Sequence, residues 1–236
     1  MKSCTTNGIV AASLSLLLCS GTAAFASANE SNGGVGLGAT RLVYHESDKQ
    51  ISLSLRNTSA QTPFLVQSFV LNSAQAKTED FVVTPPLFLL KTQRENLIRI
   101  MYVGPDLPKD RESLFYVSSR AIPSTEKSDG GKNQLKIAVQ SVIKMFWRPD
   151  NLPVSISNAP AALRCSYSGS DILVDNPTPY FITLTQMKVG TQLLKNEMIA
   201  PKSQHTFKVP HQVTGKLKYR TINDYGAITE ELECKS

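Results

Sequence analysis

Residues 134–149 read Gln134-Leu-Lys-Ile-Ala-Val-Gln-Ser-Val-Ile-Lys-Met-Phe-Trp-Arg-Pro149, and they are the most strongly patterned segment of the chain. Leu135, Ile137 and Val139 alternate with polar or small residues, which is the period-two pattern of a strand with one apolar face. The segment is rich in β-branched and aromatic residues, which favour a strand over a helix. At roughly 14 residues it is much longer than the usual strand of about 5–6. We therefore predict a long strand that ends at Pro149, because proline cannot donate a ladder hydrogen bond.

Lys144 is the one charged residue inside the most apolar part of this segment, and it allows two interpretations. In the first, the segment is an ordinary core strand and Lys144 lies at a sheet edge with its ammonium group in water, since buried lysines are rare. In the second, the first half of the strand offers its apolar side chains to another protein. An exposed strand edge with an apolar face is a template for a further strand.

The N-terminus has the pattern of a secretory signal peptide. Lys2 is followed by an apolar run from Ile9 to Cys19, and then by small residues at the cleavage positions Ala24-Phe-Ala26 and Ala26-Ser-Ala28. The apolar run, about 11 residues, is too short to span a bilayer, which takes ~20. We predict that residues 1–28 are a signal peptide and that the mature chain starts near Ser27 or Asn29.

The cysteine count agrees with export from the cytoplasm. Of the 4 cysteines, Cys4 and Cys19 fall in the signal peptide, which leaves Cys165 and Cys234. An even pair in an exported chain suggests a disulfide. It would close a loop of roughly 70 residues, worth about 4 kcal/mol in the chain-entropy model. Two free thiols or a metal pair is the alternative.

Composition excludes several classes of function. The formal charge of +6 favours acidic or carboxylate-bearing partners. Basic runs are short, which makes nucleic acid a poor partner. The 3 histidines lack the spacing of metal ligands, and the sequence has no nucleophile motif, metalloprotease motif or nucleotide loop. We predict a protein that is not an enzyme, with no cofactor, no metal and no small-molecule substrate.

Short strand-like runs with turn signals between them fill the rest of the chain. Before the long strand they lie at 37–44, 51–55, 64–71, 81–90, 96–103 and 114–122. After the connector Pro149-Asp-Asn-Leu-Pro153 they resume at 163–167, 172–174, 181–189, 205–209, 216–222 and 227–233. No run carries a helical period. We predict an all-β protein of two immunoglobulin-like β-sandwich domains, at residues 29–149 and 150–236.

Four segments in order resemble periplasmic pilus-assembly chaperones of the chaperone–usher pathway. They are Thr40-Arg-Leu-Val-Tyr44, Leu107-Pro-Lys-Asp-Arg-Glu-Ser-Leu-Phe-Tyr116 running on to Ile122-Pro123, Ile143-Lys-Met-Phe-Trp-Arg-Pro149, and Asn223-Asp-Tyr-Gly-Ala227. Ser118-Ser119 departs from the family signature, where an asparagine or cysteine and an aliphatic residue are usual. This departure leaves open whether the chain is of the short-loop or long-loop subfamily.

The resemblance implies a periplasmic chaperone with its two domains in a boomerang arrangement. Such chaperones bind pilus or fimbrial subunits that lack their last strand, complete them with a donor strand, and deliver them to an outer-membrane usher. Leu135, Ile137 and Val139 match the donor side chains. Arg41 and Lys144 match the cations that bind the carboxylate at the subunit's C-terminus.

Glu112, Arg148 and Asp224 match an ionic network between the two domains. Taken singly, each residue has a simpler interpretation: Arg41 and Glu112 as solvated surface residues, Asp224 as a turn former, and Arg148 as a side chain stacked on Trp147. Lys144 also has the opposite strand parity to Leu135, Ile137 and Val139. Either a β-bulge reverses the alternation, or the lysine acts from the other face.

Two other classes of protein compete with a chaperone. An exported enzyme lacks support from any catalytic motif. A fimbrial subunit or adhesive module would also be an exported β-sandwich, but a subunit is normally a single incomplete domain with an N-terminal donor segment. The sequence leaves open which subunit, usher or fibre is involved, and whether the free protein self-associates through its exposed strand.

Overall fold

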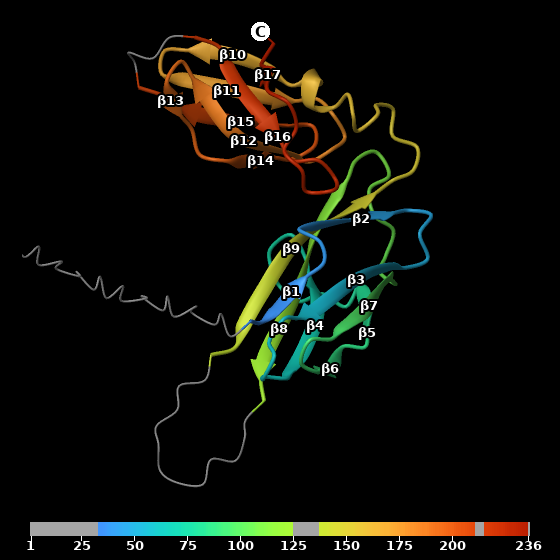
Figure 1. Ribbon diagram of the computed structural model, residues 1–236. Coiled ribbons are helices and arrows are strands. Elements are labelled where there is room, and N and C mark those ends of the chain that lie inside the picture. Colours follow the sequence, from blue (N-terminus) through green and yellow to red (C-terminus); the bar gives the residue numbers. More distant parts are fainter. Residues whose placement is uncertain (1–32, 125–136, 211–214, 236) are drawn as a thin grey trace, which may run out of the picture. The chain divides into compact units, whose positions relative to one another are not determined.

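The structure is a computed structural model that describes residues 33–124, 137–210 and 215–235 (Figure 1). The predicted signal peptide and Leu135 lie outside the described residues. In the described part, strands account for every regular element except a single 3-10 turn, η1 (Pro160–Ala162). The predicted all-β class is therefore confirmed, whereas the domain boundaries and the boomerang arrangement stay predictions.

Two sheets make up the first sandwich. One has the order β1-β3-β7-β5 and the other the order β2-β9-β8-β4-β6. The strands are β1 (Val35–Leu37), β2 (Arg41–His45), β3 (Ile51–Asn57), β4 (Phe64–Leu71), β5 (Phe81–Thr84), β6 (Leu87–Leu90), β7 (Glu95–Tyr102), β8 (Ser113–Pro123) and β9 (Val139–Arg148). The inward-facing side chains of both sheets form one core, which includes Leu55, Ile98, Val117, Met145 and Trp147.

The first strand differs from the prediction. The sequence pattern predicts one strand over 37–44, but β1 ends at Leu37 and β2 begins at Arg41. β1 pairs with β3 in one sheet, and β2 pairs in parallel with β9 in the other. The chain crosses from one sheet to the other between these strands, so a single apolar segment covers an edge of both sheets. Periodicity cannot show such a crossing, because the apolar pattern continues through it.

β9 is the described part of the predicted long strand, and its pairing is regular. It pairs with β8 from Val139 to Trp147 and with β2 from Lys144 to Arg148, with no register shift in either ladder. Met145 and Trp147 point into the core. Lys144 therefore belongs to the opposite face, and the described strand has no bulge that would turn it round.

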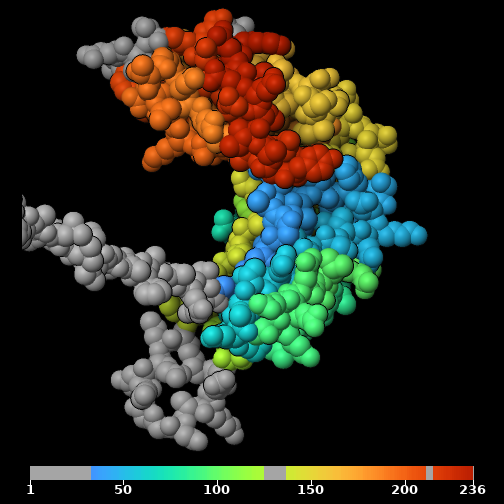
Figure 2. Space-filling view, viewed as in Figure 1, coloured from blue at the N-terminus to red at the C-terminus, as the bar shows by residue number. Residues whose placement is uncertain are grey.

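The second sandwich also has two sheets. One has the order β10-β11-β15, and the other has β13-β12-β16-β17 with β14 paired to β12. The strands are β10 (Arg164–Ser168), β11 (Asp171–Asn176), β12 (Ile182–Val189), β13 (Gln192–Leu193), β14 (Glu197–Ile199), β15 (Ser203–Lys208), β16 (Leu217–Thr221) and β17 (Leu232–Glu233). Of the predicted strand at 227–233, only its end forms β17. In the space-filling view the last part of the chain, coloured red, covers much of the visible face of this sandwich (Figure 2).

The predicted disulfide is present between Cys165 of β10 and Cys234 beside β17. Both cysteines are buried in the core of the second sandwich, with Leu163, Leu217 and Tyr219 among the other members of that core. The bond links an early strand of one sheet to the final strand of the other. A domain this small buries little surface, so a covalent link contributes a large share of its stability.

We expect Cys165–Cys234 to be the single disulfide of the exported protein. Mass spectrometry of the purified oxidised protein should find no alkylated cysteine until a reductant is added. Reduction should lower the denaturation midpoint, because the unfolded chain gains about 4 kcal/mol of loop entropy in the chain-entropy model. Two thiols that react with an alkylating agent before reduction would contradict the assignment.

Candidate functional site

Arg148, at the end of β9, binds two carboxylates that lie far apart in the sequence. Its Nε donates to Glu112 Oε1 at 2.7 Å, and its Nη1 and Nη2 donate to the two oxygens of Asp224 at 2.7 and 2.8 Å. The side chain of Arg148 is 8% exposed and that of Glu112 is 1% exposed. The bidentate fork to Asp224 is a strong and directional form of ion pair. The structure thus brings the three predicted residues into one buried cluster.

Glu112 also holds the backbone of the second sandwich. Its carboxylate accepts a hydrogen bond from the Phe181 amide, and its own amide donates to the Pro179 carbonyl, both at 2.8 Å. The Tyr180 ring between them lies 5.2 Å from the Arg148 guanidinium. The simpler interpretation, in which Arg148 stacks on Trp147, is wrong, because consecutive strand residues point to opposite faces.

The charge states in this cluster follow from burial and pairing. Burial raises the pKa of Glu112, and the charge of Arg148 opposes this shift. Burial alone would lower the pKa of Arg148, but the hydrogen bonds and charges of Asp224 and Glu112 outweigh it and hold that pKa above its ordinary value. The guanidinium therefore stays charged, and both carboxylates depend on it.

The turn that follows β16 presents Asp224. The Asn223 side-chain oxygen accepts hydrogen bonds from the amides of Tyr225 and Ala227, which closes the turn. Gly226 has a φ of +83° and lies directly against Thr40, where a Cβ atom would collide with the threonine hydroxyl. The interpretation of Asp224 as a turn residue is thus compatible with its ion pair to Arg148.

Arg41 and Lys144 lie side by side, since they are register partners in the parallel ladder of β2 and β9. Arg41 Nη1 donates to the Ile222 carbonyl at 2.9 Å, and its guanidinium lies 5.8 Å from the centre of the Phe146 ring. Burial, followed by the charge of Arg41, lowers the pKa of Lys144. In the part of the chain that the structure describes, neither cation forms an ion pair with a carboxylate.

Of the predicted donor residues, Val139 is the first residue of β9 and Ile137 lies just before it. Ile137 is 65% exposed and Val139 is 58% exposed, whereas Leu135 is outside the described residues. β2 pairs with β9 only from Lys144 onward, so the described ladders leave one edge of residues 139–143 without a partner strand. Lys144 belongs to the same strand as this edge, and Arg41 lies beside it on the neighbouring strand β2.

Sequence reasoning missed Phe146, which lies between the two cationic positions of β9. It shares a face with Lys144 and Arg148, and its ring centre lies 5.6 Å from that of Phe181 in the second sandwich. The strand parity of Lys144, Phe146 and Arg148 could have revealed this shared face. Thr183 and Ile222 were also missed, because their place beside Arg41 depends on the pairing of β12 with the chain after β16.

Within the described ranges, no group of three or more histidine, cysteine or acidic side chains could hold a metal ion. No helix among the described residues is long and apolar enough to cross a membrane.

We expect Arg148→Ala to lower the free energy of unfolding by about 3–5 kcal/mol, because it leaves Glu112 buried without its cation. Denaturant titration of the purified protein measures the change. Arg148→Lys should recover only part of the loss, since an ammonium cannot make the bidentate fork.

Arg111→Ala is the matched control. Arg111 pairs with Asp110 at 2.9 Å on the surface, and exposed pairs contribute little to stability. The two alanine variants should therefore differ clearly. An unfolding midpoint for Arg148→Ala equal to that of Arg111→Ala would show that the cluster contributes no more than a surface pair.

Family models match both halves of the chain. The model of the pili and flagellar-assembly chaperone, PapD N-terminal domain, matches residues 34–153, and the model of the pili assembly chaperone PapD, C-terminal domain, matches residues 158–233. Among curated relatives, the probable fimbrial chaperone protein ElfD of Escherichia coli is 53% identical over 237 residues and is covered, like this chain, over 100% of its length. The chaperone protein FimC of Escherichia coli is 40% identical over 206 residues, with 87% of this chain and 86% of the relative covered.

Solved structures agree with the sequence relatives. The periplasmic chaperone SfaE superposes with a TM-score of 0.74 at 37% identity, covering 86% of this chain and 100% of the other. A chain in the complex of the Salmonella enterica SafA pilin with the SafB chaperone gives a TM-score of 0.78 at 30% identity, covering 86% and 97%. The chain belongs to the family of PapD-like pilus-assembly chaperones, which are two immunoglobulin-like β-sandwiches and are not enzymes.

Proposed function

We propose that this protein is a periplasmic chaperone that captures pilus or fimbrial subunits by donor-strand complementation and passes them to an outer-membrane usher. The observation that carries the proposal is the unpaired edge of β9 at residues 139–143, which leads directly to Arg41 and Lys144. The similar structure of a pilin in complex with a chaperone supports the same class of partner.

The donor segment is the apolar, exposed start of β9 together with Ile137 just before it. Ile137 and Val139 leave more than half of their surfaces in water. Such a strand edge is normally shielded, because it invites pairing with other chains. A subunit that lacks its last strand would pair with this edge through backbone hydrogen bonds and would bury the aliphatic side chains in its open groove. Each fully buried side chain of this type contributes about 1.5–3 kcal/mol.

The carboxylate site is the pair Arg41 and Lys144. Two cations on neighbouring strands repel each other, and the pKa of Lys144 is lowered by burial first and then by the charge of Arg41. An anion between them removes the repulsion and accepts hydrogen bonds from both. A chain end supplies such an anion at one defined position, so the pair would fix the register of the subunit along β9.

The ionic cluster of Glu112, Arg148 and Asp224 lies next to this site and helps to hold its residues in place. Arg148 belongs to the same strand as Lys144, and Asp224 belongs to the turn next to Ile222, whose carbonyl holds Arg41. We propose that this ionic network sets the orientation of the two domains and thereby the distance between the cations and the donor strand.

The rival interpretation as a fimbrial subunit has no observation in its favour. Both sandwiches have two sheets and a filled core in the described residues. A donor segment in the middle of the chain also fits a chaperone, which completes the sandwich of another protein, better than a subunit, whose own sandwich lacks a strand.

We expect Lys144→Ala and Ile137→Asp each to abolish recovery of subunit complexes while the chaperone stays folded. Lys144→Ala removes half of the carboxylate site, and losing one charged partner of a desolvated contact costs about 2–5 kcal/mol. Ile137→Asp places a charge in the apolar groove of the subunit. The assay is co-purification of the subunit from periplasmic extract after co-expression with the neighbouring fimbrial operon.

Lys49→Ala is a control for loss of charge alone, because Lys49 is exposed on the loop between β2 and β3. It should yield as much complex as the wild type. Wild-type yields from both Lys144→Ala and Ile137→Asp would refute donor-strand capture for this protein.

Subunit capture should also weaken at high pH. Only the protonated ammonium of Lys144 attracts a carboxylate, and its pKa lies below the ordinary 10.5. Complex stability should therefore begin to fall as the pH rises through that lowered pKa, where the free chaperone loses the Lys144 proton. It should continue to fall until the bound lysine, whose pKa the carboxylate raises, is deprotonated as well. Lys144→Arg should flatten this dependence, since a guanidinium does not titrate there. Dissociation rates of purified complexes across pH measure the effect, and parallel profiles for the two proteins would count against it.

A further inference from the structure

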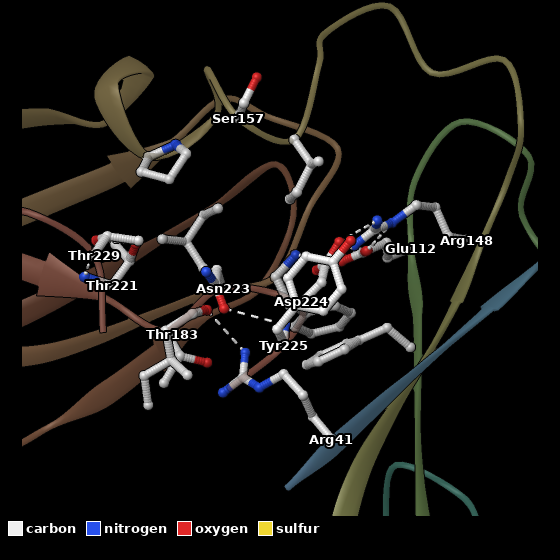
Figure 3. A pocket seen from close by; sticks show the side chains of 16 residues that line it. Arg41, Glu112, Arg148, Ser157, Thr183, Thr221, Asn223, Asp224, Tyr225 and Thr229 are labelled. Atoms are coloured by element: carbon white, nitrogen blue, oxygen red, sulfur yellow. Dashed lines mark hydrogen bonds and ion pairs between the residues drawn. The ribbon is translucent and has the colours of Figure 1, made fainter. Parts of the chain in front are cut away.

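A pocket of about 230 Å3 opens beside Arg41 (Figure 3). We call it the Arg41 pocket, and its lining includes Arg41, Phe146, Phe181, Ile182, Thr183 and Ile222. Figure 3 shows the Arg148–Glu112 cluster on one side and Thr183, Thr221 and Thr229 on the opposite side. Lys144 is not part of the lining, which consists of Arg41, Glu112, Phe146 and Arg148 together with residues from Ile156 onward.

Two polar atoms in this pocket lack hydrogen-bond partners. Among the described residues, the buried side-chain nitrogen and oxygen atoms without a partner are Arg41 Nε and Thr183 Oγ1. Both residues line the Arg41 pocket. A buried donor without a partner destabilises the fold, and such groups are rare outside functional sites. Their occurrence in one pocket indicates that something else supplies the missing partners.

The size of the pocket selects the class of occupant. A water molecule has a share of about 30 Å3, so the pocket is too large for one or two bridging waters. Small-molecule sites measure about 300–1,000 Å3, so it is too small for a typical cofactor or drug-sized ligand. A volume between these limits suits one amino-acid side chain.

Arg41 connects the pocket to the proposed carboxylate site. Its Nη1 donates to the Ile222 carbonyl, and its side chain is part of the lining of the pocket. In a C-terminal residue, the carboxylate and the side chain are attached to the same Cα atom. A chain end whose carboxylate meets Arg41 and Lys144 therefore carries its last side chain to the mouth of the Arg41 pocket.

We propose, on the basis of the proposed function, that the Arg41 pocket holds the side chain of the subunit's C-terminal residue. The residue has a long apolar body and a neutral polar tip. The body packs against Phe146, Phe181 and Ile222. Arg41 Nε and Thr183 Oγ1 are buried in the free protein, and a small shift of their side chains exposes them to hydrogen bonding with the tip. The guanidinium of Arg41 repels the charged tip of a lysine or arginine, and the two carboxylates that also line the pocket, Glu112 and Asp224, are already paired with Arg148. The pocket makes the chaperone selective for the last residue of its subunit, beyond the terminal carboxylate that every chain end possesses.

The test is a competition inside the periplasm. The chaperone is co-expressed with two forms of the subunit encoded beside it, one native and one with its last residue replaced by alanine. Mass spectrometry measures the ratio of the two forms in the purified complexes, normalised to their ratio in the extract. The wild-type chaperone should prefer the native form by about tenfold or more, because a buried side chain of this size is worth at least that factor.

Thr183→Leu fills the pocket, so the normalised ratio of native to alanine-terminated subunit in the complexes should fall close to one. Thr183→Val removes the hydroxyl at constant shape and should reduce the preference by a smaller factor. Thr206→Leu is the matched control, an exposed threonine of β15 away from the pocket, and should keep the full preference. The ratio of the two subunit forms in the complexes does not depend on how much folded chaperone each variant yields, because both forms compete for the same chaperone. If Thr183→Leu yields no protein, Thr183→Val and the alanine-terminated subunit still test the proposal.

The outcomes separate the two proposals. Capture of neither form of the subunit overturns the proposed function, and the pocket assignment with it. Capture of both forms in equal ratio by the wild type, or a preference unchanged in Thr183→Leu, overturns the pocket assignment alone. A native subunit that ends in glycine, alanine, lysine or arginine also contradicts it.

Discussion

The ion pair of Arg148 with Glu112 and Asp224 is the interaction on which the rest of the site depends. A buried guanidinium is costly to desolvate, and replacing such a cluster with apolar residues would often stabilise a protein. The cluster is therefore better explained by the positions in which it holds the residues of the site than by a contribution to the stability of the fold. Arg148 extends the strand that carries Lys144, Glu112 binds the backbone at Phe181, and Asp224 adjoins the residue whose carbonyl holds Arg41. Each residue of the cluster thus positions a different residue of the site.

The two halves of β9 differ in burial and in pairing. Its second half, from Met145 to Arg148, is buried and alternates between the core of the first sandwich and the ionic cluster. Its first half has one unpaired edge and exposed aliphatic side chains. Proteins normally protect such edges with charges or a covering segment. Here β2 covers the buried half only, and the two cations stand where the covered half begins. A partner strand can therefore pair along the open half and stop at a fixed point.

Arg41 lies beside Lys144 in the first sandwich and is hydrogen-bonded to Ile222 of the second sandwich. Its Nη1 is satisfied by a backbone carbonyl, which orients the guanidinium without neutralising its charge. Arg41 and Thr183 both line one pocket, and Arg41 Nε and Thr183 Oγ1 are buried without hydrogen-bond partners. A pocket with two such polar atoms discriminates strongly between side chains that can satisfy them and those that cannot. Recognition of one chain end can then include both its carboxylate and its last side chain.

The sequence by itself was sufficient for the all-β class, the two sandwiches, the disulfide and the residues of the ionic cluster, because strand alternation, cysteine parity and family motifs are local signals. It was misleading at residues 37–44, where an unbroken apolar pattern conceals the crossing from β1 to β2. Only the tertiary structure decided that no bulge reverses the alternation in the described part of β9, that the edge of β9 is open before Lys144, and that Thr183 lies beside Arg41. These features depend on which strands pair and where their ladders end. Pairing joins residues far apart in the chain, as Arg41 and Lys144 are, and one sequence read without relatives carries no signal for such distances.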